Sequence, residues 1–281
     1  MNNLTIEDVL RMIRAIQSLH DEMGRILNAL GHQPQPGSQA EAELSGFQEP
    51  EHIQDAYIQA NLLIEGAADH LMAFTKTVTE PAATIAPWTC VRGALESGAL
   101  AAWLIDPALD ATVRVQRSFA FRYEGLDQQV KCVRAFGLVS DLQRAKDRID
   151  KVERDALRLG YAQVTNTRGD RIGIGQNMPS ITEIIGATLN AEGPYRLASA
   201  MAHAHNWAIS QLGFRRADDG GRLLLEKHLN PVSIAYLCVG GANAFAKPVW
   251  QKFRLFGWDT KDLEGVFNAV FADLHSRWSA P

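Results

Sequence analysis

The chain has 281 residues, of which 46% are hydrophobic and 21% are charged, and its formal net charge is −4. This size and composition allow a large buried core in one domain or two modest ones, and the slightly acidic balance excludes a protein whose whole surface is basic. No uncharged run reaches the ~20 residues of a membrane span, and the N-terminus lacks the basic and apolar regions of a secretion signal. We therefore expect a soluble, cytoplasmic protein with no membrane partner.

The three cysteines, Cys90, Cys132 and Cys238, are odd in number and far apart in apolar surroundings. This pattern favours reduced core thiols over a disulfide framework. It agrees with a reducing, cytoplasmic environment.

Charge is unevenly distributed along the chain. Residues 1–80 contain 4 basic and 12 acidic side chains, whereas residues 111–171 contain 13 basic and 8 acidic ones. A basic stripe in the second region could contact phosphate groups, with Arg114 and Arg117 as candidates because an i, i+3 spacing places them on one helical face. Alternating signs, as in residues 144–155, are also typical of a solvated helix face.

The N-terminal part begins with an amphipathic helix. Apolar residues recur at helical spacing over residues 4–30, Thr5 and Asp8 resemble a capping pair, and Gly31 ends the pattern. Residues 31–50 have no apolar periodicity and are rich in Gly, Pro and Gln, which predicts a mobile linker. We expect three parts: a helix at 1–30 that can pack separately or on a partner subunit, a linker at 31–50, and a bundle domain at 51–281.

The rest of the chain is predicted to be helical. Apolar spacing indicates helices near residues 51–79, 88–105, 109–136, 140–159, 180–189, 195–211, 232–256 and 262–278. Residues 161–180 form the longest irregular stretch, and residues 218–221 favour a turn. No segment alternates with the period of a strand, so we expect an all-α protein, a multi-helix bundle with a separable N-terminal helix and linker.

Polar residues interrupt three of these helices. The nearly all-apolar helix at 88–105 contains only Arg92 and Glu96 as charges, one turn apart, and buried charges need partners. Asp69 and His70 lie beside the apolar stripe of the helix at 51–79. In the helix at 195–211, four polar side chains share one face, and we expect them to meet Arg92 and Glu96 in a polar site: Arg196, Ser199, His203 and Asn206.

Arg196, followed by six residues and then His203, resembles the R-x(4–6)-H motif of HEPN-domain proteins, which are helical nucleases and binding modules of toxin and phage-defence systems. The resemblance implies that Arg196 and His203 are catalytic at an RNA phosphate without a metal ion or another cofactor. Residues 92–107 together with 195–203 are also similar to a group of uncharacterised actinobacterial and phage-encoded helical proteins of the abortive-infection type. That similarity implies that Asp69, His70, Arg92 and Glu96 belong to one polar cluster with Arg196 and His203. Ser199 and Asn206, on the same helical face as Arg196 and His203, complete the expected supporting residues.

Two other functions stay open. A bundle with a separable helix suits a non-catalytic protein-interaction or dimerisation module, so the partner is either RNA or a protein, and a homodimer is expected. The alternative of a metal-binding oxidase would use Glu65, Asp69, Glu96, His203 and His205, but the sequence does not contain the required two Glu-x-x-His pairs of ferritin-like proteins. We therefore expect no metal and no cofactor.

Overall fold

The computed structural model describes residues 4–31, 33–79, 82–219, 222–227 and 230–278, and most of these residues are helical. The long helices are α1 (Ile6–Leu30), α3 (Pro50–Thr77), α4 (Ala86–Leu104), α5 (Ala111–Ala135), α6 (Val139–Arg158), α10 (Pro231–Phe256) and α11 (Lys261–Trp278). The short ones are α2 (Gln39–Gly46), α7 (Ile181–Leu189), α8 (Glu192–Ala202), α9 (Asn206–Ala208) and the π-helical turn η1 (Ile209–Gly213). The predicted all-α class and multi-helix bundle are confirmed.

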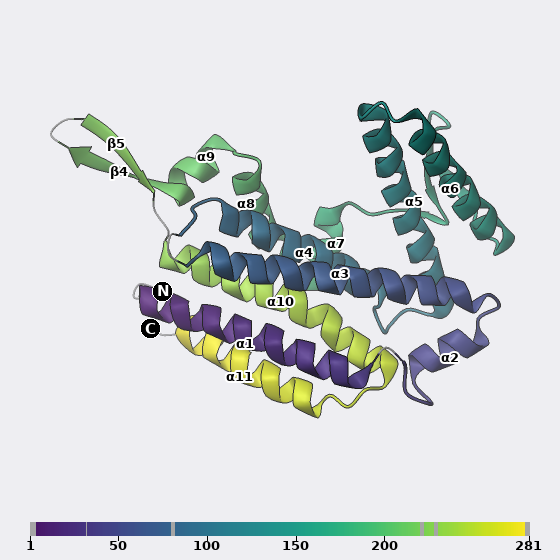
Figure 1. Cartoon of the computed structure of the whole chain (residues 1–281), viewed down its shortest axis with the longest axis horizontal. Helices are drawn as coiled ribbons and strands as arrows, with labels where there is room; N and C mark the ends of the chain where they lie inside the picture. Colours follow the sequence, from purple (N-terminus) through teal and green to yellow (C-terminus); the bar gives the residue numbers. More distant parts are fainter. Residues whose placement is uncertain (1–3, 32, 80–81, 220–221, 228–229, 279–281) are drawn as a thin grey trace.

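Helix α4 is the centre of the bundle. It packs against α3, α10, α8 and α7 (Figure 1), as expected for a helix that is apolar on all sides. Its contact with α10 is close, because a Cβ atom added to Gly98 would lie 2.0 Å from the carbonyl oxygen of Ala244. In the described part of the chain, no helix combines the length and apolar content that crossing a membrane requires.

Helix α1 belongs to this core, which corrects the expectation of a separable N-terminal helix. Thr5 and Asp8 form the predicted capping box. Beyond this cap, the apolar stripe packs against α11, α10 and α3. Met12, Ile16 and Leu19 have no exposed surface, so separating α1 would expose a continuous apolar stripe to water.

The predicted linker is also packed. Its residues include α2, which Ser38 caps by accepting the amide N–H of Glu41. The amide of Gln35 donates to the carbonyl of Phe256 at 2.9 Å, and the indole of Trp258 donates to the carbonyl of Gln33 at 3.0 Å. Main-chain groups of this segment are therefore bonded to residues at and just after the end of α10, which corrects the expectation of an unstructured linker.

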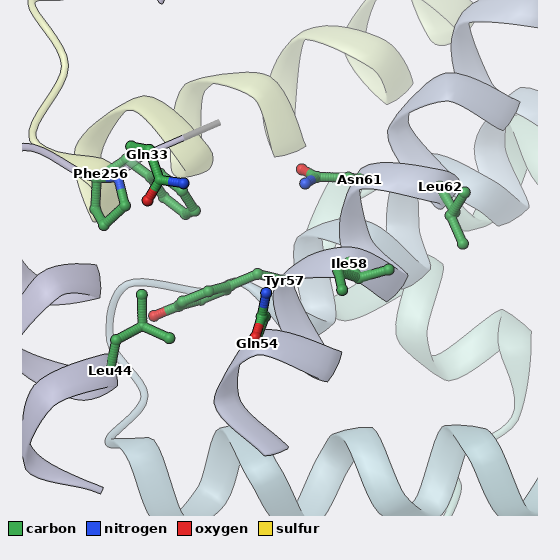
Figure 2. Close-up of a pocket in the computed structure, with 9 residues that line it drawn as sticks. Gln33, Leu44, Gln54, Tyr57, Ile58, Asn61, Leu62 and Phe256 are labelled. Carbon is green, nitrogen blue, oxygen red and sulfur yellow. The ribbon is translucent and has the colours of Figure 1, made fainter. Parts of the chain in front are cut away.

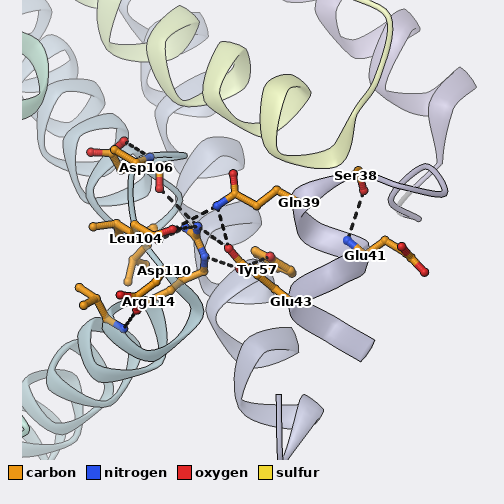
Figure 3. A network of polar contacts seen from close by, with 12 residues as sticks. Ser38, Gln39, Glu41, Glu43, Tyr57, Leu104, Asp106, Asp110 and Arg114 are labelled. Atoms are coloured by element: carbon orange, nitrogen blue, oxygen red, sulfur yellow. Dashed lines mark hydrogen bonds and ion pairs between the residues drawn. The ribbon is translucent and has the colours of Figure 1, made fainter. Parts of the chain in front are cut away.

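Arg114 is fully buried and joins α2 to the connection between α4 and α5 (Figure 3). Its Nε and Nη2 donate to the two carboxylate oxygens of Glu43 at 2.8 and 3.0 Å, and its Nη1 donates to the carbonyl of Leu104 at 2.9 Å. The hydroxyl of Tyr57 donates to Glu43 at 2.7 Å, and burial raises the pKa of Tyr57. This corrects the expectation of a phosphate contact at Arg114, because its guanidinium is out of reach of any external anion.

Two small antiparallel sheets form, one within residues 161–180, which the sequence predicts to be irregular, and one in the segment that contains the turn expected at 218–221. β1 (Gln163–Thr165), β2 (Arg171–Ile174) and β3 (Gln176–Asn177) form one sheet, and β4 (Phe214–Asp219) pairs with β5 (Arg222–Lys227). Strands of two to six residues carry too few alternations to produce a period of two. The expected turn at 218–221 falls partly on residues 220 and 221, which lie outside the described residues.

The cysteines are all free. Cys238 is buried on α10, and burial raises the pKa of its thiol. Cys132 is exposed on α5, so the expectation of a core position is wrong for this residue.

Candidate functional site

The helix expected over residues 195–211 ends early, and its end shapes the candidate site. α8 stops at Ala202, where the amides of Ala204 and His205 donate to the carbonyls of Met201 at 3.1 Å and Ala200 at 2.9 Å. This Schellman arrangement requires a left-handed residue after the cap, usually glycine. Ala204 takes that conformation with φ of 56°. Because no glycine marks the end, apolar spacing alone extends the predicted helix too far.

His203 is the C-cap residue of α8, and its exposed side chain contacts Arg92 from α4. Nη1 of Arg92 lies 3.0 Å from Nε2 of His203. A guanidinium has no acceptor atom, so Nη1 donates and Nε2 accepts, which leaves the proton of the neutral imidazole on Nδ1. The structure thus brings together two of the expected site residues that are 111 positions apart.

Glu96 and Tyr195 hold the Arg92 side chain in place. Oε1 of Glu96 accepts from Nε of Arg92 at 2.8 Å and from the hydroxyl of Tyr195 at 3.0 Å. Burial, followed by the negative charge of Glu96, raises the pKa of Tyr195, so its hydroxyl stays protonated and donates. The guanidinium also lies 5.9 Å from the centre of the Tyr195 ring, which is within the range of a cation–π contact.

A second imidazole, that of His205, stands beside His203. The two ring centroids are 6.5 Å apart and the rings are nearly perpendicular. Both residues are exposed, as is Asn206 at the start of α9. An i, i+2 pair would point in different directions on a continuous helix, and for this reason the sequence argument placed His205 only among the candidate metal ligands and not in the site with His203. Its only signal is a His-x-His pair at the end of a run of small residues.

Arg196 does not join this cluster. Its side chain is 67% exposed, and its Nε donates to Oε1 of Glu192 at 2.8 Å, one turn earlier on α8. The structure therefore does not bring the Arg196 guanidinium to Arg92, Glu96 and His203, because it turns back to Glu192. Ser199 is half-buried, and its carbonyl accepts the amide of His203 at 2.9 Å.

Asp69 and His70 lie on α3, next to the same region of α4. The His70 ring packs against Gly93, where an added Cβ would be 2.6 Å from ring atoms. Asp69 is exposed. The pKa of Cys90 is raised mainly by burial of the thiol and secondly by the negative charge of Asp69. Among the described residues, no hydrogen bond links either side chain to the Arg92 cluster.

Arg117 is engaged within the chain, like Arg114. Its Nη1 donates to the carbonyl of Trp103 at 2.6 Å, and its guanidinium lies 4.9 Å from the centre of the indole ring. Burial lowers the pKa of Arg117. The i, i+3 pair predicted to contact phosphate is thus used to fasten the start of α5 to the end of α4.

One group of metal-ligand side chains occurs among the described residues. Ligand atoms of Glu49, Glu51 and His52 lie within 4.8 Å of one another. Arg158 already donates to both oxygens of Glu49, at 2.9 and 2.6 Å, so a metal ion would have to displace a guanidinium. The group contains none of the residues considered for a metal oxidase: Glu65, Asp69, Glu96, His203 and His205.

No protein-family model, curated protein or solved structure matches this chain. The geometry of the cluster formed by Arg92, Glu96, Tyr195, His203 and His205 is therefore the basis for a functional proposal.

Proposed function

We propose that the chain is a HEPN-like nuclease that cleaves RNA without a metal ion, in a toxin or phage-defence setting, and that Arg92 takes the place of Arg196. The observation that carries the proposal is the 3.0 Å contact between Nη1 of Arg92 and Nε2 of His203 at the protein surface. A guanidinium and an imidazole at this distance can act on the same phosphodiester.

Phosphate binding would activate His203. A phosphate oxygen is a charged acceptor and forms a stronger hydrogen bond with a guanidinium than a neutral imidazole does. When a phosphate oxygen accepts the hydrogen bond from Nη1 of Arg92, the lone pair on Nε2 of His203 becomes free. That lone pair then accepts the proton of the 2′-hydroxyl while the 2′-oxygen attacks phosphorus.

The second imidazole completes the proton balance. As the bond from phosphorus to the 5′-oxygen breaks, protonated His205 donates a proton to that oxygen. The products are a 2′,3′-cyclic phosphate and a 5′-hydroxyl end. Arg92 stabilises the additional negative charge on the pentacoordinate phosphorus, and Glu96 keeps the guanidinium oriented through Nε.

The test measures cleavage of single-stranded RNA in the presence of EDTA. His203→Ala and His205→Ala should each lower the rate about 10²–10⁴-fold, and Arg92→Ala should lower it about 10²–10³-fold. Arg196→Ala is the matched control and should change the rate less than about twofold, because it removes only an exposed ion pair. A substrate with 2′-deoxyribose at the cleaved position should not be cleaved by the wild type or by any variant.

Two results would overturn the proposal. The first is a wild-type protein that cleaves no RNA. The second is a loss in Arg196→Ala as large as that in Arg92→Ala. Thermal unfolding of each variant separates lost chemistry from lost folding, since a folded His203→Ala protein without activity supports a role in the reaction.

A non-catalytic interaction module is the second candidate. One observation favours it: Arg92, Glu96, Tyr195 and His203 satisfy one another within the chain, as a structural bond between α4 and α8 requires. In that case Arg92→Ala costs about 1–3 kcal/mol of unfolding free energy, and no variant differs in RNA cleavage from a buffer control.

A further inference from the structure

The connection between α5 and α6 exposes three apolar side chains close together. Phe136, Leu138 and Val139 are 75%, 49% and 79% exposed. Figure 1 shows α5 and α6 extending as a pair away from the other helices, with this connection at their far end. We call these three residues the hairpin tip. Apolar surface of this extent in water favours a partner that covers it.

A hollow of complementary character lies between α2, α3 and α10. Its volume is about 540 Å³, which exceeds that of a phenylalanine or leucine side chain. Figure 2 shows its lining, including Leu44 from α2, Tyr57, Ile58 and Leu62 from α3, and Phe256 from α10. Ile58 and Leu62 are 47% and 68% exposed, so this hollow is also uncovered within one copy.

The charges around these two surfaces are opposite. The face of α3 that exposes Ile58 and Leu62 also exposes Glu51, Glu65 and Asp69, at steps of seven, four and three residues. Within residues 131–150, which include the hairpin tip, five exposed cations, among them Arg134, Lys146 and Arg148, outnumber the exposed anions Asp147 and Asp150. This local contrast follows the 12 acidic and 4 basic side chains of residues 1–80 against the 13 basic and 8 acidic ones of residues 111–171.

We propose that the hairpin tip of one copy binds in the α2–α3–α10 hollow of a second copy. Every chain carries both surfaces, and Figure 1 shows the tip directed away from α2, α3 and α10, so a tip fills a hollow only between copies. The apolar side chains provide the burial, and the acidic and basic borders orient the contact. This contact is independent of the proposed RNA cleavage.

Sedimentation of the full chain at about 100 µM and low salt tests the contact, since a small interface of this kind binds with about micromolar affinity. The wild type should exceed its monomer mass of 31.0 kDa. Phe136→Gln removes the main side chain of the tip and Leu62→Gln the most exposed one of the hollow, and each should weaken association at least about tenfold. Ile6→Gln, at a residue that is 73% exposed on α1, is the matched control and should associate like the wild type.

Mixing the two variants gives the decisive result. Phe136→Gln keeps an intact hollow and Leu62→Gln keeps an intact tip, so an equimolar mixture should form a complex more tightly than either variant alone. Raising the salt to about 0.5 M should weaken wild-type association because it screens the opposite charges. His203→Ala should associate like the wild type.

Several outcomes would overturn the proposal: a wild type that is monomeric throughout, variants that associate like the wild type, or a mixture no tighter than its parents. A monomeric wild type that binds anionic lipid vesicles through Phe136 would assign the tip to a membrane surface and would likewise overturn it.

Discussion

Replacing Arg114 with methionine is expected to lower the free energy of unfolding by about 3–5 kcal/mol. Arg114 has no exposed surface, and its partner Glu43 is 8% exposed. The variant leaves the carboxylate of Glu43 buried without its cation, and it removes the donor to the carbonyl of Leu104. A buried charge that loses its partner costs far more than an exposed pair.

The structure places the loss near the lower end of this range. The hydroxyl of Tyr57 and the amide of Gln39 still donate to Glu43, at 2.7 and 2.9 Å, after Arg114 is removed. A loss of about 3 kcal/mol corresponds to about 6 °C in Tm, at roughly 2 °C per kcal/mol for a chain of this size. Urea unfolding of the wild type and the variant gives the free energy directly.

A double variant separates the effect of the Glu43–Arg114 ion pair from the effect of the space that the two side chains fill. Glu43→Leu combined with Arg114→Met should recover most of the loss, because apolar side chains often replace a buried ion pair at little cost. Arg11→Met is the control, since it breaks only the exposed pair with Glu7 and should change stability by less than about 1 kcal/mol. A loss below about 1 kcal/mol in Arg114→Met, or a double variant as unstable as the single one, would refute the reasoning.

Two further predictions concern Lys252 and Ala204. Burial lowers the pKa of Lys252 from 10.5 to about 8, although its ammonium faces the rings of Phe256 and Trp258 at 5.7 and 5.0 Å. Between these pH values the unfolded chain holds a proton that the folded chain has released, so stability rises with pH. Lys252→Met should therefore raise the free energy of unfolding by about 1–3 kcal/mol at pH 7 and by less above pH 8. Urea unfolding at several pH values measures this gain, and a gain that does not change with pH would contradict the prediction. Ala204→Gly should add about 0.5–1 kcal/mol by relieving its left-handed backbone, and an unchanged or lower Tm would count against that strain.

The helices could be predicted from the sequence because their apolar residues repeat over many turns. α4 is the clearest case, since its two charges are outnumbered by apolar residues on every side. The segment between α1 and α3 could not be predicted in the same way. Its packing depends on partners such as Arg114 for Glu43, 71 positions away, and a local pattern contains no information about such a partner.

The candidate site was predictable only in part, for a related reason. Arg92 and Glu96 stood out because they are charges in an apolar helix, and that argument depends on burial alone. The pairing of Arg196 with His203 relied on their spacing in one helix, but spacing does not determine which partner a guanidinium binds, and Arg196 binds Glu192 one turn earlier. The helix end at Ala204, which adopts a conformation that glycine usually takes, brings His203 and His205 near each other, and periodicity could not reveal this.

The arginine that contacts His203 comes from α4 and not from α8, and this difference matters for the mechanism. If Arg196 served His203, the pair would lie within one helix and would persist in any state that keeps α8. With Arg92 as the partner, the contact exists only while α4 and α8 pack together, and Tyr195 on α8 is bonded to Glu96 on α4 at the same junction. Loosening this junction separates the guanidinium from the imidazole without altering either residue. Tyr195→Phe should therefore lower RNA cleavage although both His203 and Arg92 are unchanged. A Tyr195→Phe protein with full activity would show that the guanidinium needs no support from α8.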